Sequence, residues 1–157
     1  MSKRREVALQ AIQAYNEWNI DAIMAYRDES CTQEVLPKSL KRPPMDNATY
    51  RAAFGSTMPL FKNFTVMIDD VFEDKAGNKV AMWVRSTAET AAGPYRNEYV
   101  MMFDFTEDGS KVVRVREFVD SAISKDFFNK LNDKVEETGG TWDAAAWGVG
   151  KKAKGKL

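Results

Sequence analysis

The sequence predicts an α+β domain in which N-terminal helices pack against a curved antiparallel sheet. Apolar residues recur at helical spacing over the N-terminal third, and at every second position over most of the remainder. The stretches of period two follow one another with short turns between them, which is typical of an antiparallel meander. A curved sheet that wraps a long helix forms a cone, with an apolar deep end and a mouth that can hold a ligand.

The N-terminal third predicts three helices. Their ranges are 5–19, 19–30 and 45–61, the last ending between Gly55 and Pro59. Asn19 or Asp21 is suited to cap the second helix, because its side chain accepts hydrogen bonds from free backbone N–H groups. Asp46 or Asn47 occupies the equivalent place before the third. Three prolines within residues 31–44 break any helix, so we expect a loop there.

The following segment predicts four strands and a closing helix. The strands span residues 64–74, 79–90, 95–105 and 111–121. The intervening turns, "KAGN", "AAGP" and "TEDGS", contain the glycine that tight turns favour. Residues 124–138 predict the closing helix, capped by Ser121 or Ser124.

A length of 157 residues fits one domain with a single core. We place this domain at residues 1–137 and a C-terminal tail at 138–157, part of which we expect to be disordered because its end is rich in lysine and glycine. Trp142 and Trp147 flank an alanine run in the tail, which indicates a short helix packed over the domain or over a partner chain.

Charge and hydropathy exclude several classes of protein. Acidic and basic residues number 23 each, so nothing marks the chain as a binder of nucleic acid or of membrane surfaces. No apolar run approaches the ~20 residues that span a bilayer, and no hydrophobic signal segment follows the basic start. We therefore expect a cytoplasmic protein.

The chain contains no histidine and a single cysteine, Cys31. This composition excludes Ser-His-Asp and Cys-His catalysis and an internal disulfide, and it argues against a zinc site. Cys31 itself is expected to be a small buried residue, and the acidic run from Asp69 to Asp74 a solvated strand end. Acid–base chemistry then falls to carboxylates, tyrosines, lysines or Cys31, and a carboxylate acts near neutral pH only if burial raises its pKa.

Strand alternation places polar groups on faces that are otherwise apolar. One face of residues 95–105 carries Tyr95, Asn97, Tyr99, Met101, Phe103 and Phe105. In the last strand, Glu117 interrupts a row formed by Val113, Val115 and Val119. An ionised carboxylate among valines needs a cation or hydrogen-bond donors, and a tyrosine hydroxyl of the neighbouring strand is such a donor.

Each of these groups also has a structural interpretation. Glu117 can lie at an open end of the sheet beside a surface arginine, and the two tyrosines can pack with their hydroxyls at the rim. Arg27, at the end of the second predicted helix, either interacts with the helix dipole or reaches the pocket mouth to pair with Glu117. The apolar side chains expected at the cone, as packing or as substrate contacts, are Trp83, Met101, Phe64 and Met58.

Four motifs in this order resemble the fungal SnoaL-like proteins, which have the nuclear transport factor 2-like fold. They are R-x-x-x-C-T from Arg27, V-L-P-x-S-L from Val35, G-x-Y-x-N-E-Y from Gly93 and E-F-V-D-S from Glu117. The resemblance covers roughly residues 4–132. It implies a cone that commonly forms a homodimer through the outer face of its sheet.

The resemblance also implies a role in fungal secondary metabolism, where members include isomerases of meroterpenoid pathways and a cofactor-free semipinacolase. The semipinacolase pattern has an arginine before the C-T segment, two tyrosines four apart and a glutamate in the last strand. These positions are Arg27, Tyr95, Tyr99 and Glu117. We therefore expect a cofactor-independent isomerase or rearrangement catalyst that acts on a hydrophobic polycyclic intermediate.

In this mechanism Glu117 transfers a proton, while Tyr95 and Tyr99 stabilise developing negative charge on a substrate oxygen. Arg27 holds Glu117 ionised or binds the substrate oxygen, and Asn97 orients a substrate amide or carbonyl. No cofactor and no metal are expected.

One departure from the family pattern narrows the chemistry. Many relatives have a histidine near the position of Gln33, so histidine-dependent dehydration of the scytalone dehydratase type is disfavoured here. The Asp–Arg–Asp set of limonene epoxide hydrolases also has no place in this sequence. Three alternatives remain: a cyclase or pericyclase of the same fold, a non-catalytic small-molecule binding protein, and an interaction protein whose pocket is filled by its own side chains.

Overall fold

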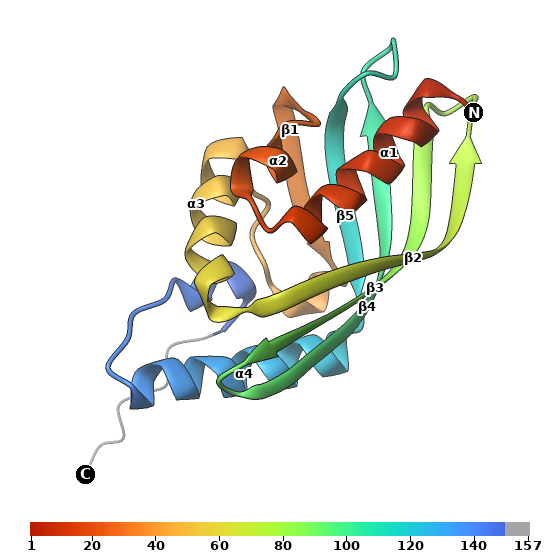
Figure 1. Ribbon diagram of the computed structural model, residues 1–157. Helices are drawn as coiled ribbons and strands as arrows, with labels where there is room; N and C mark the ends of the chain where they lie inside the picture. The colour runs from red at the N-terminus through yellow and green to blue at the C-terminus, as the bar shows by residue number, and fades with distance from the viewer. Residues whose placement is uncertain (150–157) are drawn as a thin grey trace.

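The computed structural model describes residues 1–149 and shows helices packed on a curved five-stranded sheet (Figure 1). The elements in chain order are α1 Lys3–Gln13, η1 Ala14–Glu17, α2 Ile20–Met24, β1 Arg27–Leu36, η2 Lys38–Leu40, α3 Asn47–Thr57, η3 Met58–Leu60, β2 Lys62–Asp74, β3 Lys79–Thr90, β4 Gly93–Phe105, β5 Val112–Val119, α4 Ser121–Glu137 and η4 Ala144–Trp147, where η denotes a 3-10 helix. The predicted α+β class is confirmed.

The sheet has the order β1-β5-β4-β3-β2. Strands β2 to β5 form the antiparallel meander that the sequence predicts. The prediction of a loop at residues 31–44 is wrong over its first half, because β1 runs parallel to β5 there. The prolines begin only at Pro37, and Cys31, Gln33 and Val35 alternate into the core before it. The buried Gln33 interrupts the apolar alternation that would have revealed this strand.

A bulge shifts the parity at the start of β5. The register between β4 and β5 changes between Asp104 and Phe105, so that Val112 is buried and the predicted inward position of Val113 is wrong. Beyond the bulge the alternation holds, and Val115 and Val119 are buried on either side of Glu117.

Capping residues fix where the helices begin. Asn19 caps α2 and Asp46 caps α3, each accepting backbone N–H groups of the first turn. Helix α2 ends at Met24, so Arg27 begins β1 instead of closing a helix. The predicted cap of α4 is wrong, since Asp120 accepts from the Ile123 N–H and Ser124 is fully buried instead.

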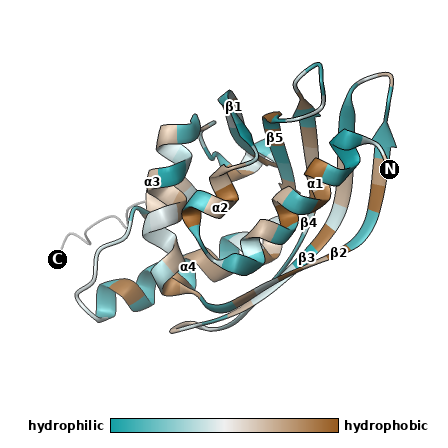
Figure 2. Cartoon of the chain, turned by 45° about the horizontal axis from the view of Figure 1, so that its top comes forward, coloured by the Kyte–Doolittle hydropathy of each residue, from teal (hydrophilic) through white to brown (hydrophobic). Residues whose placement is uncertain are grey.

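Helix α1 forms the core with the concave face of the sheet. Its inward face carries Val7, Ala8, Ala11 and Ile12, which pack against the core residues of β3 and β4. Figure 2 shows apolar residues along α1 and along the strands beneath it. Burial of a large aliphatic side chain stabilises the fold by about 1.5–3 kcal/mol, and the alanines let the helix approach the strands closely.

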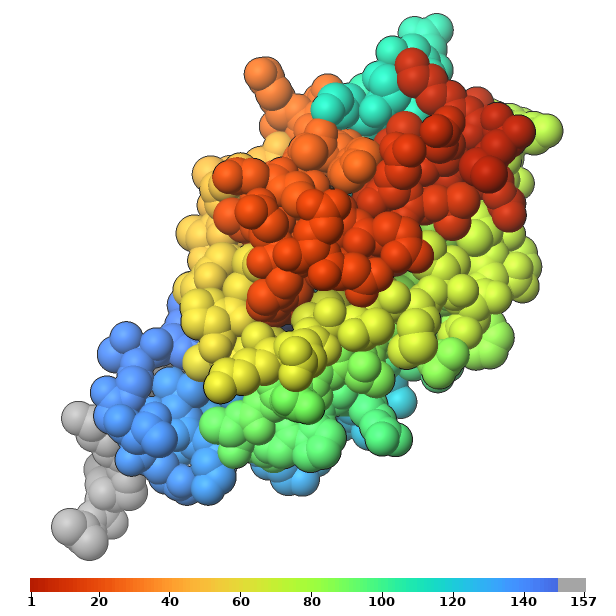
Figure 3. Space-filling model, in the orientation of Figure 1, coloured from red at the N-terminus to blue at the C-terminus, as the bar shows by residue number. Residues whose placement is uncertain are grey.

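The segment after α4 folds back onto the domain. Helix η4 and the indole of Trp142 pack against α3 and α4, which is one of the two arrangements that the sequence predicts for the tryptophan pair. In the space-filling view this C-terminal segment lies beside α4 at one end of the molecule (Figure 3). The lysine-rich stretch for which we expect disorder falls on residues 150–157, outside the described residues.

Candidate functional site

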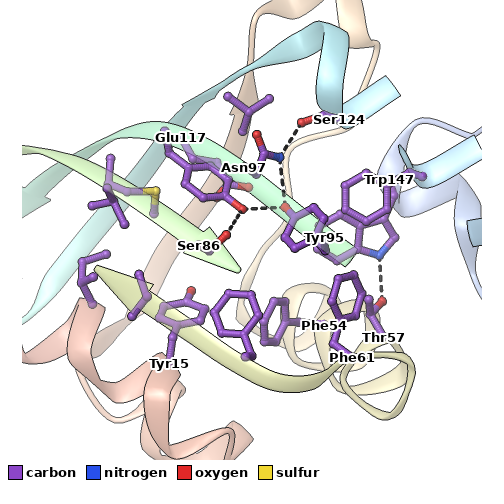
Figure 4. Close-up of a pocket in the computed structure, with 18 of the residues that line it drawn as sticks. Tyr15, Phe54, Thr57, Phe61, Ser86, Tyr95, Asn97, Glu117, Ser124 and Trp147 are labelled. Atoms are coloured by element: carbon purple, nitrogen blue, oxygen red, sulfur yellow. Dashed lines mark hydrogen bonds between the residues drawn. The ribbon is translucent and has the colours of Figure 1, made fainter. Parts of the chain in front are cut away.

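A cavity lies between the concave face of the sheet, the helices α3 and α4, and η4 (Figure 4). It contains about 830 Å³ of space not occupied by protein atoms, its open mouth included. The cavity volume itself is about 80 Å³, well below the roughly 300–1,000 Å³ typical of ligand pockets, so a large ligand needs the space at the open mouth as well. Most of its wall is apolar and aromatic, and the polar groups gather on β3, β4 and β5 and around one arginine.

A line of hydrogen-bonded hydroxyls follows the β3–β4 wall. The Tyr99 hydroxyl oxygen lies 2.6 Å from that of Tyr95 and 2.7 Å from the Ser86 Oγ. The Asn97 amide nitrogen donates to the Tyr95 hydroxyl at 2.9 Å and to the Ser124 Oγ at 2.8 Å. Three hydroxyl hydrogens of Ser86, Tyr95 and Tyr99 share two oxygen–oxygen contacts, so one hydrogen is left to donate to a ligand oxygen.

A second tyrosine pair comes from the helical side. The hydroxyl oxygens of Tyr15, in η1, and Tyr50, in α3, lie 2.6 Å apart, and both residues line the cavity. Burial raises the pKa of Tyr15 to about 12. Burial also raises the pKa values of Tyr50, Tyr95 and Tyr99, so all four phenols are neutral hydrogen-bond donors at neutral pH.

Glu117 presents its carboxyl to the cavity from β5, where it lies opposite Met101 of β4 and Val35 of β1. Burial raises the pKa of this carboxyl, while the positive charges of Arg42 and then Arg27 act in the opposite direction. Within residues 1–149 neither arginine forms an ion pair with it. The two guanidinium groups therefore influence Glu117 through space, and its oxygens remain free for a ligand.

Arg27 is held beside the cavity and does not line it. Its Nε donates to the Asn47 Oδ1 and its Nη1 to the Gln33 Oε1, both at 2.8 Å. Its guanidinium lies 4.5 Å from the centre of the Tyr50 ring. Both sequence interpretations are corrected, because Arg27 lies at the start of a strand and is not paired with Glu117. It supports Tyr50 from behind and raises the positive potential of the site.

Arg42 is the charged group that the sequence interpretation missed. It is only 8% exposed, lines the cavity, and lies 5.2 Å from the Phe128 ring centre and 5.5 Å from that of Trp147. Desolvation lowers the pKa of Arg42, and the largest opposing influence is the negative charge of Glu117. In the sequence "KSLKRPP", Arg42 has the pattern of a charged residue in an exposed loop. Only Trp142 and Trp147 indicated that another segment covers this loop.

The residues predicted for the wall divide into two groups. Asn97, Met101 and Phe64 line the cavity together with Glu117 and the two tyrosines of β4. The prediction for Trp83 is wrong, since it lies on the outer face of β3 and is 44% exposed, while Val84 and Ser86 point inward. The prediction that Met58 lines the cavity is also wrong, because its side chain is buried in the helical cluster behind the wall.

The C-terminal segment completes the wall. Trp142 and Trp147 both donate their indole N–H to the Thr57 Oγ1 at 2.9 Å. The Trp147 ring stacks on Phe128 with 5.1 Å between the ring centres. Figure 4 shows Trp147, Phe54 and Phe61 together at the aromatic end of the cavity. The segment that the sequence assigns to a tail is thus part of the site.

Other candidate chemistry is not supported by geometry. Cys31 is buried, as predicted, and burial raises its pKa. Of the acidic run, Asp69 pairs with Arg85 on the outer face. Residues 1–149 contain no group of three or more potential metal ligands. None of the helices among them is long and apolar enough to cross a membrane.

The chain is a cone-shaped α+β domain with an aromatic cavity and an inward-facing acid. The chain belongs to the SnoaL-like domain family, whose model matches residues 8–115. The family resemblance carried by the four sequence motifs is therefore confirmed.

Several similar proteins come from fungi, and their names point to different activities. Core atranone cluster protein 11 of Stachybotrys chlorohalonatus is 35% identical over 131 residues, which are 83% of this chain and 98% of that protein. Monooxygenase nsrQ of Aspergillus novofumigatus is 33% identical over 126 residues, 80% of this chain and 83% of that protein. The crystal structure of BvnE pinacolase from Penicillium brevicompactum matches with a TM-score of 0.80 at 29% identity, covering 83% of this chain and 92% of that one.

Proposed function

We propose that the protein is a cofactor-independent isomerase or rearrangement catalyst that acts on a hydrophobic polycyclic intermediate of fungal secondary metabolism. One observation carries this proposal: Glu117, a carboxyl whose pKa burial raises, faces the same apolar cavity as the Tyr95–Tyr99 hydroxyl pair. The similarity to a pinacolase and to a protein of a biosynthetic cluster supports it.

Proton transfer by Glu117 accounts for an isomerisation with all atoms conserved. The carboxylate removes a proton from a carbon next to a carbonyl, and the electron pair moves onto the carbonyl oxygen. The free hydroxyl hydrogen of the Ser86–Tyr99–Tyr95 line donates to that oxygen. Where a C=C bond adjoins this carbon, the protonated Glu117 then returns the proton to the far carbon of that bond, which shifts the double bond, restores the carbonyl and regenerates the carboxylate.

A rearrangement uses the same groups. Glu117 takes the proton of a substrate hydroxyl, whose oxygen becomes a carbonyl as a carbon substituent migrates to the neighbouring carbon. The bond that breaks at that carbon leaves its electrons on an oxygen, which receives a proton from a tyrosine hydroxyl, and the protonated Glu117 then returns its proton to that phenolate. The aromatic wall holds the substrate in the conformation from which migration occurs and keeps water away from the cation-like centre.

The expected contributions are large enough for a reaction that is slow without a catalyst. A positioned acid or base contributes about 10²–10⁴-fold to the rate. One donor to a developing oxyanion contributes about 3–4 kcal/mol. Both act in an apolar site, where electrostatic interactions are stronger than in water.

The proposal is tested with the compound that accumulates when the gene is deleted. Purified protein, incubated with this compound without oxygen and without added cofactor, is expected to give a product of unchanged mass. A product heavier by one oxygen atom, formed only in the presence of oxygen, would support the activity in the name of the nsrQ relative instead. Binding without any conversion would indicate a carrier protein.

We also propose that two copies associate through the outer face of the sheet. Trp83, Val100 and Phe118 are paired across β3, β4 and β5, and form an apolar row in which each residue is 42–49% exposed. Large apolar side chains in a contiguous exposed patch are typical of an association surface.

A further inference from the structure

Arg42 is buried without a polar partner. No hydrogen bond or ion pair joins its guanidinium to the residues 1–149, and its Nε is a buried donor left unsatisfied. Its contacts are the Phe128 and Trp147 rings, which attract the charge but accept no ordinary hydrogen bond. Since an arginine carries five N–H donors and its burial without an anion is costly, this arrangement calls for an acceptor from outside residues 1–149.

The charges around the cavity point to the same kind of acceptor. Two guanidinium groups, those of Arg27 and Arg42, act on the single carboxyl of Glu117. The four tyrosines of the wall are neutral. With Glu117 ionised, the charges of Arg42 and Glu117 on the wall balance, and Arg27 beside the wall adds one positive charge; with Glu117 protonated, the wall itself is positive.

The position of Arg42 depends on the C-terminal segment. Gly148 has a positive φ of 74°, and a Cβ at this position would lie 2.7 Å from the Leu40 carbonyl oxygen and 3.2 Å from the Arg42 Cγ. Only glycine allows the chain to pass so close in this conformation. The C-terminal segment thus places the Trp147 ring against one side of the Arg42 guanidinium and shields this group from bulk water.

We propose that Arg42 binds an anionic oxygen of the substrate, such as a carboxylate, enolate or phenolate carried by a polycyclic ring system. The ring system lies against the aromatic wall, and the oxygen takes the donors that the protein leaves free. Arg42 thereby selects acidic polycycles over neutral ones of the same shape. This inference shares the cavity with the proposed function, but it concerns binding and does not depend on turnover.

The test compares two probes of equal size, 2-naphthoate and 2-naphthamide, at a pH where the acid is ionised. Binding is measured by calorimetry and by quenching of tryptophan fluorescence, since Trp18 and Trp147 line the cavity. We expect the wild-type chain to bind the naphthoate more tightly. The substitution Arg42→Met is expected to weaken naphthoate binding by about 10- to 100-fold, as for the loss of a charged hydrogen bond, and to leave naphthamide binding within about threefold.

Arg51→Met is the matched control. It removes the same charge from the surface of α3, where Arg51 pairs with the exposed Asp21, and both affinities are expected to stay unchanged. If circular dichroism shows that Arg42→Met does not fold, Arg42→Gln takes its place and must show the same loss of naphthoate binding.

Three results would overturn the inference. They are a wild-type chain that does not prefer the acid, an Arg42 variant that retains the preference, and an equal loss of both probes, which would indicate a packing role. Because the probes are not converted, each result leaves the proton-transfer proposal standing. Conversely, a chain without isomerase activity that still prefers the acid leaves this inference standing.

Discussion

Tyr95 and Tyr99 hold their hydroxyl oxygens 2.6 Å apart on the wall of the cavity. They stand four residues apart on one strand, so their side chains point the same way and lean toward each other. Ser86 anchors one end of the line that they form, and Asn97 the other. The phenols at the start of a face that ends in phenylalanine therefore form a hydrogen-bonded array that leaves one hydroxyl hydrogen free to donate.

Tyr99→Phe removes the central hydroxyl of this array and leaves those of Ser86 and Tyr95 without their shared partner. We expect the free energy of unfolding to fall by about 1–3 kcal/mol, as for other buried hydrogen bonds that lose one partner. Urea denaturation followed by circular dichroism measures the change. Tyr26→Phe is the control, because the Tyr26 hydroxyl makes no hydrogen bond within residues 1–149. Equal effects of the two substitutions would contradict the array.

Glu117→Gln is expected to change how stability depends on pH. Burial raises the pKa of Glu117 above its value in an unfolded chain, about 4.3. Folding thus favours the protonated form, so its stabilising contribution is complete below about pH 4 and is lost as pH rises through the folded-state pKa. The glutamine variant does not titrate, and its stability relative to wild type must therefore grow over this interval and then level off.

The other groups that face Glu117 do not produce the same signal. They are Arg27 from β1, Arg42 from the segment after η2, Tyr15 from η1, Tyr50 from α3, and Tyr95 and Tyr99 from β4. Burial raises the pKa values of the four tyrosines, so they stay neutral between pH 4 and 8, and arginine side chains do not titrate in this range. A pH-independent difference between the two proteins would mean that folding does not raise the pKa of Glu117.

Trp147→Ala removes the stack on Phe128 and the hydrogen bond to Thr57. Because Trp147 is only partly buried, we expect a loss of about 1–3 kcal/mol, less than for a fully buried aromatic side chain. Trp147→Phe keeps an aromatic ring and is expected to lose less. Thermal unfolding of the three proteins gives the comparison, and an unchanged melting temperature for the alanine variant would show that the C-terminal segment does not hold the wall.

Trp83→Glu places a charge in the middle of the outer apolar row. If this face is where two copies meet, the substitution is expected to shift the protein from dimer to monomer in sedimentation velocity. Ile123→Glu is the control, since Ile123 is a comparably exposed apolar residue of α4. A wild-type protein that sediments as a monomer, or a Trp83 variant that remains dimeric, would argue against this interface.

Local alternation was enough to predict much of the site. It placed Glu117 inward among valines and put Tyr95, Asn97 and Tyr99 on one face, because side-chain direction in a strand follows residue parity. The alternation of β3 also holds, but Trp83 was assigned to the wrong face, although it shares a face with the exposed Arg85. Parity failed at the start of β5, where a bulge inserts one residue.

The remaining features depend on contacts between distant segments. Strand β1 contains the buried Gln33, whose side chain accepts from Arg27, and the sequence does not show that partner. Arg42 is buried only because η4 returns from the far end of the chain to cover it. The family motif correctly placed Arg27 near the cavity. Its hydrogen bonds with Asn47 and Gln33, however, hold its guanidinium behind the wall.

Turnover of the accumulated compound by wild-type protein and by Glu117→Gln tests most directly whether Glu117 moves the proton. Circular dichroism and melting temperature first establish that the variant is folded. We predict that conversion by the variant falls by at least about 100-fold, the lower end of what a positioned acid or base contributes, while binding of the compound persists. Conversion by the variant at the wild-type rate would remove Glu117 from the chemistry and leave a cavity that acts by shape alone.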